Sequence, residues 1–546
     1  LRKELEMEGV QFKSHSDTEV LLQLYARYGA DCLSLLRGMF AFAVRDNQNG
    51  KLFLARDPLG IKPLYYFRTD KLFVFASELR ALLASELMPR RLNPAGLTSY
   101  LQNGSVSSPE TIVEGIRLLQ PGHFITVEHE ENGNLTIKET SYVGAWLENA
   151  KAPKGLDRDA AVEALRETLK ESVRVHLESD VPLGPFLSGG IDSSAIVALM
   201  GQVTNARPKT FSVVFEEERF SEAEHARHVA TRFGTEHHEI HLGEDQLFDM
   251  LPSAIAAEDQ PTMDGINTFV VSKAVKEAGI TVALSGLGGD ELFAGYPAFR
   301  RALRLQSAAR LPAGLRQGVS SLGQRFWNGS VQQQKLWQLL RSDGSPNAAC
   351  TVSRQLLSVE EVETLLSFPP ATENGEPPRN GIDNVINQGD VINAVSRWEL
   401  NGYMSNTLLR DTDFMSMAHS LEVRVPCVDA EVVNFVLGLP GEWKLNGGRQ
   451  KPLLQDALGD LLPSEVMNRR KMGFTLPLVD WMQSRLRNEI ETTFANGSHF
   501  KAIGLQPDSV RRVWRQFLQA PQRVGWSRPW ALYVLGRWCE QHQVSL

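Results

Sequence analysis

The sequence predicts a layered α+β domain over residues 1–150, followed over residues 151–546 by a doubly wound α/β domain with a parallel sheet and a helical C-terminal part. Short strands with few long helices up to about Val127 indicate the first domain. Strands that alternate with helices from Val181 onward indicate the second. A chain of 546 residues is also too long for one ordinary core, which favours two or three domains.

The N-terminal part begins with two helical segments, each ending at a glycine, and continues with short apolar strands. Gly9 and Gly29 end the helices, and Asn47 to Gly50 reads as a hairpin turn. The expected elements are helices over 1–8 and 20–28 and strands over 38–46, 51–56 and 72–76. Residues 128–156 are charged and weakly patterned, so we place the domain boundary just before the amphipathic helix expected over Asp157 to Leu177.

The second part alternates strands and helices and then becomes helical. The expected strands are Val181 to Leu187, Lys209 to Phe215, His237 to Leu242 and Thr281 to Ser285. Residues 302–366 read as helical without a chemical motif. Residues 368–390 are rich in Pro, Gly, Asn and Glu, which is typical of a mobile surface loop. Helical patterning resumes at Val391 and persists to the end.

Bulk properties exclude several classes of function. A net charge of −8 and a pI near 5.9 argue against a nucleic-acid-binding surface. The four cysteines are too scattered for a metal motif or a disulfide framework, which favours a reducing compartment. There is no apolar run long enough for a bilayer and no zinc-ligand spacing. We therefore expect a cytoplasmic protein with neither a nucleic-acid nor a membrane partner. A homodimer is one of the oligomeric states that the sequence allows.

A glycine-rich turn at residues 188–194 joins an apolar strand to a helix. Its sequence is Ser-Gly-Gly-Ile-Asp-Ser-Ser. Adjacent glycines bring backbone N–H groups close to a ligand, and three hydroxyls lie beside a helix start that favours negative charge. The alternative is an ordinary strand-turn-helix connection. We predict a phosphate site, and it is not a Walker loop because no lysine follows the glycines.

A second glycine-rich turn follows the strand that ends at Ser285, and it carries Asp290 and Glu291. If its strand neighbours the first one, Asp192 and Asp290 could share Mg²⁺, which prefers oxygen ligands and bridges phosphates. Alternatively, the two acids only favour the start of the next helix.

Two charged clusters complete the candidates. Residues 469–474, Arg-Arg-Lys-Met-Gly-Phe, could aim cations at phosphates and stabilise leaving pyrophosphate, or they could form a basic surface turn. Residues 410–413 and 419–426 interleave charges with apolar residues, which favours structural ion pairs over catalysis.

Together these motifs resemble the class II glutamine-dependent asparagine synthetases. The matching segments cover nearly the whole chain and are 16–19, 38–42, 55–66, 75–78, 121–123, 188–194, 284–296, 422–426 and 471–474. The resemblance implies an N-terminal-nucleophile (Ntn) glutaminase domain followed by a PP-loop ATP pyrophosphatase domain. It also implies ATP, Mg²⁺, glutamine and aspartate as ligands, with ammonia passing through an internal tunnel.

The resemblance also implies roles for individual residues. Asp17 would hold the glutamine amino group, and Lys471 would stabilise adenylation and amidation. The remaining ATP-site positions are Leu187, Ser188, Gly189, Gly190, Asp192, Ser193, Ser194, Val213, Ser285 and Gly286, with Asp192 and Asp290 as the magnesium carboxylates.

Two departures from the family pattern modify these expectations. The N-terminal cysteine, the arginine and the Asn-Gly pair of the family glutaminase are not present, and we attribute this to truncation, since Leu1 reads as part of a helix already under way. Leu287 replaces a glutamate thought to assist attack by ammonia, and leucine cannot transfer a proton. The alternatives are therefore an amidotransferase acting on a sugar acid or peptide, or an ATP-binding protein without ligase activity.

Overall fold

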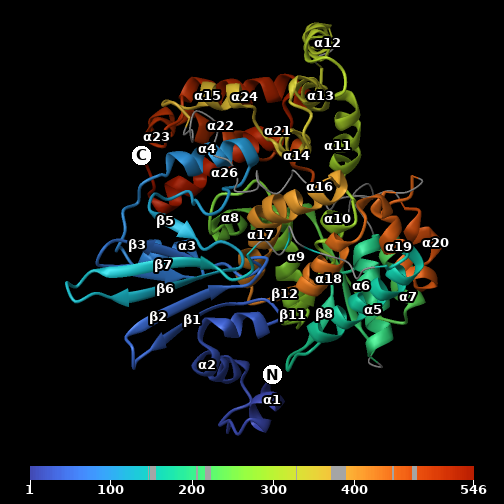
Figure 1. Ribbon diagram of the computed structural model, residues 1–546. Coiled ribbons are helices and arrows are strands. Elements are labelled where there is room, and N and C mark those ends of the chain that lie inside the picture. Colours follow the sequence, from blue (N-terminus) through green and yellow to red (C-terminus); the bar gives the residue numbers. More distant parts are fainter. Residues whose placement is uncertain are drawn as a thin grey trace.

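The computed structural model describes residues 1–144, 147, 150, 155–204, 207–215, 223–326, 329–370, 389–445, 448–469 and 476–546. Figure 1 shows the N-terminal strands, blue to cyan, on one side of the molecule and a parallel sheet on the other. No helix in the described part of the chain has both the length and the apolar character that a bilayer crossing requires.

The N-terminal strands form two antiparallel sheets. Their order is β1 (Ala41–Asp46), β2 (Lys51–Arg56), β6 (His123–His129) and β7 (Leu135–Ser141) in one sheet, and β4 (Phe73–Ala76), β3 (Tyr65–Arg68) and β5 (Ile116–Leu118) in the other. The predicted hairpin is confirmed, because Asp46 pairs with Lys51 and its side chain accepts the backbone N–H of Gln48 at 2.8 Å. The prediction of weak structure after residue 128 was wrong for β7, whose alternating pattern pairs with β6.

Two buried charged side chains, Arg56 and Asp57, shape the segment that follows β2. The Asp57 carboxylate accepts the backbone N–H groups of Ile61 and Lys62, each at 2.9 Å. The Arg56 guanidinium donates to the carbonyls of Gly60 at 2.6 Å and Leu119 at 2.5 Å. Because both side chains are fully buried, these bonds hold the loop in one conformation and fix the position of Lys62.

Within the described residues, the parallel sheet has five strands. Three of them pair directly in the order β12 (Glu422–Arg424), β11 (Val282–Leu284) and β8 (Leu183–Pro185), and β9 (Lys209–Phe215) pairs with β10 (Glu236–Leu242). A parallel bridge between Phe186 and Phe211 joins the two groups, with the Leu187 N–H donating to the Phe211 carbonyl at 2.8 Å. The order is therefore β10-β9-β8-β11-β12, with all strands parallel. The chain adds β9 and β10 on one side of β8 and then β11 and β12 on the other, so the switch point lies between β8 and β11. Ligands in such sheets bind at the carboxyl ends beside this switch point.

Helices cover both faces of the parallel sheet, as the α/β prediction requires. One face packs against α5 (Arg158–His176), α6 (Ile191–Val203) and α7 (Ala223–Arg232). The other face packs against α9 (Ile266–Glu277), whose Val275 lies in one cluster with Phe211 and Ala283.

The remaining helices surround the two sheet regions. The short ones at the N-terminus and in the linking segments are α1 (Arg2–Met7), α2 (Asp17–Tyr28), η1 (Gly29–Leu35), α3 (Leu79–Ala84), α4 (Pro94–Asn103), α8 (Glu244–Ala257) and α10 (Gly289–Leu292). A helical group then comprises α11 (Pro297–Ala308), α12 (Ala313–Phe326), α13 (Val331–Arg341), α14 (Pro346–Arg354) and α15 (Val359–Leu365).

The C-terminal third is helical apart from one strand, as far as its described residues extend. Its helices are α16 (Val391–Glu399), η3 (Leu400–Leu409), α17 (Arg410–Met417), η4 (Pro426–Val428), α18 (Ala430–Gly438), η5 (Gly441–Lys444), α19 (Pro452–Leu458), η6 (Gly459–Leu461), α20 (Ser464–Met467), α21 (Leu478–Gln483), α22 (Arg487–Ala495), α23 (Gly497–Ala502), α24 (Pro507–Gln519), α25 (Pro521–Val524) and α26 (Ser527–His542). The prediction of uninterrupted helix after Val391 was wrong at β12, a three-residue edge strand too short to show a period. Most of the loop expected over 368–390 lies outside the described residues.

The largest hydrophobic core takes side chains from both ends of the chain. Tyr65, Leu97 and Tyr100 from the N-terminal part lie in one cluster with Trp530 and Trp538 of α26. The Tyr100 hydroxyl also donates to the carbonyl of Ala531 at 2.8 Å. Burial of these aromatic side chains stabilises the contact between the N-terminal strands and the C-terminal helices.

Candidate active site

The first glycine-rich turn connects β8 to α6 at the switch point of the sheet. Gly189 has a φ of +71°, and a Cβ there would lie 2.7 Å from the backbone of His225, so only glycine fits. The Ser193 hydroxyl accepts the Ser188 N–H at 3.2 Å and lies 3.0 Å from the Ser188 hydroxyl. The fully buried Ser194 hydroxyl has no hydrogen-bond partner among the described residues. The turn therefore presents hydroxyls and N–H groups at the start of α6, which suits an anion.

The second glycine-rich turn packs directly on the first. β11 and β8 are neighbouring parallel strands, with Leu284 opposite Pro185. A Cβ on Gly286 would lie 2.7 Å from the Asp192 carbonyl carbon, and one on Gly289 would clash with the Asp192 carboxylate. Glycine is needed at both positions because the two turns touch. The strands before the two turns are neighbours, which is the sequence-based condition for Asp192 and Asp290 to share a site.

A buried lysine joins the two turns. The Lys451 ammonium lies against the Asp192 carboxylate and 2.7 Å from that of Asp290. Lys451 has a left-handed backbone, with φ of +47°, just before α19, and its side chain is 5% exposed. Burial lowers the pKa of Lys451, but the attraction of both carboxylates outweighs burial and raises the pKa above its ordinary value. The lysine therefore remains charged and holds the two aspartates around one point.

The paired aspartates fit a magnesium ion. Both supply the carboxylate oxygens that Mg²⁺ prefers, and the fold already brings them around a cation, the Lys451 ammonium. The adjacent Glu291 is fully buried, and its carboxylate accepts the Tyr296 hydroxyl at 2.7 Å. Burial and the charge of Asp290 raise the pKa of Glu291 to about 7, so it holds its proton more tightly than an ordinary glutamate.

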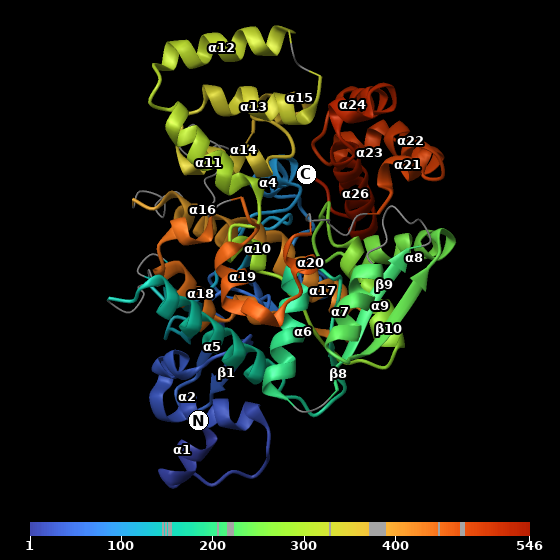
Figure 2. The same cartoon turned by 90° about the vertical axis from the view of Figure 1, so that its right-hand side faces the viewer.

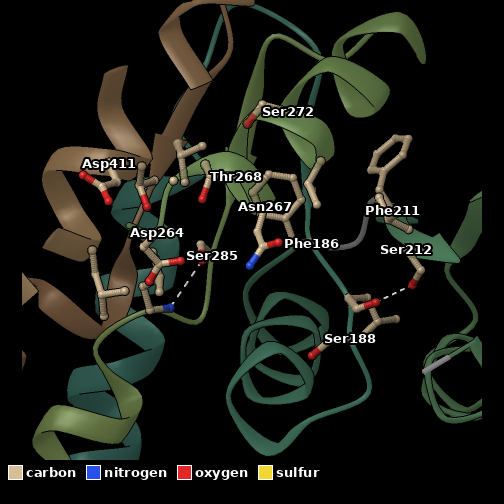
Figure 3. Close-up of a pocket in the computed structure, with 18 residues that line it drawn as sticks. Phe186, Ser188, Phe211, Ser212, Asp264, Asn267, Thr268, Ser272, Ser285 and Asp411 are labelled. Atoms are coloured by element: carbon tan, nitrogen blue, oxygen red, sulfur yellow. Dashed lines mark hydrogen bonds between the residues drawn. The ribbon is translucent and has the colours of Figure 1, made fainter. Parts of the chain in front are cut away.

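A cavity of about 250 Å³ opens beside the first turn (Figure 3). Of the predicted ATP-site residues, Leu187, Ser188, Val213 and Ser285 line it. The other predicted ATP-site residues do not line the cavity, but they belong to the same two turns. They are Gly189, Gly190, Asp192, Ser193, Ser194, Gly286 and Asp290. The other walls are Phe186, Phe211, Ser212, Asp264, Gly265, Asn267, Thr268, Val271, Ser272, Leu287, Leu408, Asp411, Thr412 and Val423.

Apolar and polar side chains both line the cavity, and Figure 3 shows Asp264 and Asp411 on one side and Ser188 and Ser212 on the other. Leu287, whose N–H donates to the Ser285 hydroxyl at 3.3 Å, lines it together with Leu408 and Val423. Asp411 accepts the Thr262 hydroxyl at 2.6 Å, and burial raises the pKa of its carboxyl to about 7. Asp264 accepts the Tyr403 hydroxyl at 3.1 Å, and burial likewise raises its pKa.

An arginine connects the Asp264 wall of the cavity to the second turn. The Arg354 guanidinium lies 4.2 Å from the Tyr296 ring centre and 3.8 Å from that of Tyr403. It also pairs with the buried Glu399 at 2.8 Å. Because the two tyrosines bond Glu291 and Asp264, one stacked cation holds both walls of the site in place.

A second cavity, of about 660 Å³, lies between the N-terminal strands and α17. Asp17, the predicted glutamine ligand, lines it at the first turn of α2, where its carboxylate accepts the Thr18 N–H at 2.6 Å. Lys62 and Glu78 line the same cavity, and Lys62 pairs with Asp413 at 2.8 Å.

Helix α17 contributes to both cavities. Asp411 and Thr412 line the first cavity, whereas Asp413, Phe414 and Met417 line the second. The charges of the 410–413 and 419–426 segments also form the expected ion pairs, such as Arg424 with Glu422 at 2.6 Å. The sequence interpretation treated this helix as structural and missed that it also lies between the two sites.

Lys471 lies outside the described residues. The nearest described member of its cluster is Arg469, whose guanidinium donates to the Ser188 carbonyl at 3.1 Å. The basic cluster thus begins directly on the first turn, which supports the proposal that its cations serve the phosphate site.

Sequence reasoning missed Lys451, Asp264 and Arg354. Lys451 carries no local signal except a lysine before Pro452, and Asp264 and Arg354 belong to neither glycine-rich turn. Arg354 ends α14, Asp264 lies just before α9 and Lys451 lies just before α19, so tertiary packing brings them to the site.

Comparison with known protein families matches two separate parts of the chain. The asparagine synthase family matches residues 164–540. The glutamine amidotransferase domain family matches residues 1–142.

Individual relatives cover most of the chain. Asparagine synthetase (glutamine-hydrolyzing) 1 of Bacillus subtilis is 33% identical over 531 residues, which is 94% of this chain and 82% of that protein. Asparagine synthetase (glutamine-hydrolyzing) 3 of the same organism is 32% identical over 576 residues, covering 100% of this chain and 86% of its own. The amidase chry2 of Gibberella zeae is 26% identical over 520 residues, 88% of this chain and 75% of its own.

Proposed function

The chain belongs to the asparagine synthase family, and from that premise we propose how its residues make asparagine. The enzyme is a carbon–nitrogen ligase that uses glutamine as amide donor. In this reaction ATP activates the side-chain carboxylate of aspartate, and ammonia then displaces AMP.

One observation carries the assignment of roles: two glycine-rich turns meet at the switch point of a parallel sheet, and their aspartates converge on Lys451. We assign the turn of residues 188–194 to the pyrophosphate part of ATP, because its N–H groups and hydroxyls sit at a helix start. Leu187, Val213, Ser285 and Gly286 would contact the nucleotide beside it. This arrangement supports a PP-loop ATP pyrophosphatase fold over residues 151–546.

Asp192 and Asp290 would hold Mg²⁺, which when bound would neutralise phosphate charge and orient the triphosphate. Lys451 positions both carboxylates and offsets their mutual repulsion. Lys471 would stabilise charge on the departing pyrophosphate from the end of the basic cluster. The acid whose carboxylate attacks the α-phosphorus would enter the cavity lined by Leu287 and Asp411.

The N-terminal glutamine amidotransferase domain, which we place at residues 1–150 with an Ntn-hydrolase fold, would supply ammonia. Asp17 would bind the α-amino group of glutamine in the second cavity. Because α17 borders both cavities, ammonia passing between them would travel along this helix. Its buried side chains would keep water from this path.

The test uses ATP, MgCl₂ and aspartate with ammonium chloride as nitrogen donor, and measures asparagine, AMP and pyrophosphate. Ammonium is used so that the result reports only on the ligase half. We expect Asp290→Asn to lower the rate of AMP formation at least about 100-fold, while the matched change Asp508→Asn on α24 leaves it unchanged. Full activity of Asp290→Asn would refute the assigned role.

A second candidate acceptor is favoured by Leu287. This side chain lines the cavity with Leu408 and Val423, so the described part of that wall is apolar where the family carries a glutamate. Such a wall suits an acid that is bulkier and less polar than aspartate, such as a peptide or sugar acid. AMP formation that depends on such an acid but not on aspartate would favour this candidate.

A further inference from the structure

The helical group α11 to α13 projects from the rest of the molecule, with α12 at its far end. Figures 1 and 2 agree that α12 lies at the outer tip and α13 beneath it. This group takes no part in the site described above, and the reaction does not explain its features.

Helix α12 buries its polar side. The buried Arg316 donates to the Ser342 carbonyl at 2.7 Å, and the buried Ser320 donates to the Trp337 carbonyl at 2.8 Å. A Cβ on Gly323 would clash with the Trp337 ring, so the third member of this face must be glycine. The contact with α13 thus uses an arginine, a serine and a glycine, whereas a surface helix ordinarily packs its apolar residues inward.

The apolar residues of α12 face solvent instead. Leu315 is 56% exposed, Val319 48%, Leu322 61% and Phe326 67%. Spacings of four, three and four residues place them in one stripe along a helix about 21 Å long. Leu311, just before the helix, is 51% exposed as well. A contiguous exposed stripe of this kind marks an interaction surface.

The same segment is strongly basic within an acidic chain. Between Pro297 and Ser342 there are seven arginines, one lysine and no Asp or Glu, although the whole chain carries a net charge of −8. Five of the arginines are exposed, namely Arg300, Arg304, Arg310, Arg325 and Arg341.

We propose that the projecting group of α11 to α13 docks on an anionic lipid surface, with the α12 stripe inserted at the headgroup level. An apolar stripe flanked by arginines is the pattern of helices that lie in a membrane interface, where both burial of apolar area and attraction to anionic lipid contribute. The sequence-based expectation of no membrane partner did not weigh this local charge. The site described above would then act near a membrane.

The charge pattern distinguishes this occupant from two others. A symmetric contact between two copies of this chain would place the same basic group against itself, and like charges repel. Nucleic acid would attract the arginines but would leave the leucine and phenylalanine stripe without an apolar partner.

Vesicle sedimentation of the whole chain tests the proposal. Vesicles of phosphatidylcholine with 30% phosphatidylglycerol are compared with pure phosphatidylcholine vesicles at 0.1 M salt. We expect the protein to sediment with the anionic vesicles only. Leu322→Gln combined with Phe326→Gln should lower the partition coefficient about tenfold or more. Replacing Arg310 and Arg325 by Ala should lower it about fivefold per arginine.

Matched controls change residues of the same type and exposure elsewhere. Leu22 and Leu87, 52% and 55% exposed, are replaced by Gln, and the exposed Arg512 and Arg515 of α24 by Ala. These variants should bind as the original chain does. Failure of the original chain to sediment, or binding that survives loss of Leu322 and Phe326, would overturn the proposal. A dimer in solution that requires the stripe would overturn it in favour of a second copy.

A site-specific label provides an independent readout. The four native cysteines are buried, so Leu322→Cys can be labelled selectively with an environment-sensitive fluorophore. Its emission should shift to the blue with anionic vesicles and stay unchanged with neutral ones, and a label at Leu87→Cys should respond to neither. No shift at residue 322 would contradict insertion of the stripe.

Discussion

Replacing Lys451 by Met removes the positive charge that lies between Asp192 and Asp290 and keeps the side-chain length. The lysine is 5% exposed, and the two carboxylates are 23% and 18% exposed. The substitution therefore leaves two mostly buried like charges facing each other, and it does not create a large cavity.

The loss of stability follows from this geometry. Removing one partner of a buried ion pair costs about 3–5 kcal/mol of unfolding free energy. Because the two carboxylates are partly exposed, we expect a loss at the lower end of this range, about 3 kcal/mol. With an unfolding entropy of about 2.1 cal/mol/K per residue over the roughly 390 residues of the second domain, this energy lowers Tm by about 4 °C. Mg²⁺ should recover part of the loss, because it can bind the two carboxylates without displacing an ammonium.

Differential scanning calorimetry with and without MgCl₂ measures both effects. Lys170→Met, which breaks the exposed pair with Glu167 on α5, is the matched control and should shift Tm by less than about 1 °C. The reasoning is refuted if Lys451→Met melts within about 1 °C of the original chain. It is also refuted if Mg²⁺ raises both Tm values equally.

Three further predictions concern the walls of the site. Arg354→Met should lower Tm by about 4 °C or more in calorimetry, because it removes the guanidinium that lies 2.8 Å from the Glu399 carboxylate, which is 0% exposed; an unchanged Tm would show that the stacked arginine contributes nothing. The raised pKa of Glu291, about 7, means that the folded state holds its proton more tightly than the unfolded state, so stability from this group is full below about pH 4.5 and is lost as pH rises to about 7. Glu291→Gln, which still accepts the Tyr296 hydroxyl, should therefore flatten the fall in unfolding free energy over that interval by about 3 kcal/mol, and urea titrations that keep the original slope would contradict this. Leu287→Glu should raise kcat for aspartate about 10-fold or more with ammonium as donor if aspartate is the acceptor, and a fall in asparagine formation would favour the bulkier acid.

Several features were predictable because they depend on neighbouring residues. The turn at 188–194, the hairpin after Asp46 and the strand over Lys209–Phe215 each follow from local glycine placement or apolar pattern. The strand β12 was missed because a three-residue edge strand shows no period, and Arg424 within it looked like part of a helix.

By itself, the sequence determined the hairpin after Asp46 and the strand over Lys209–Phe215, since both depend on residues adjacent along the chain. Only the tertiary structure decided that β8 lies beside β11, that Lys451 contacts both Asp290 and Asp192, the latter 259 residues earlier in the chain, and that α17 borders two cavities. It also decided that α12 turns its apolar stripe outward. The physical reason is that strand order and helix orientation depend on which apolar faces bury one another, and this is a property of the whole chain.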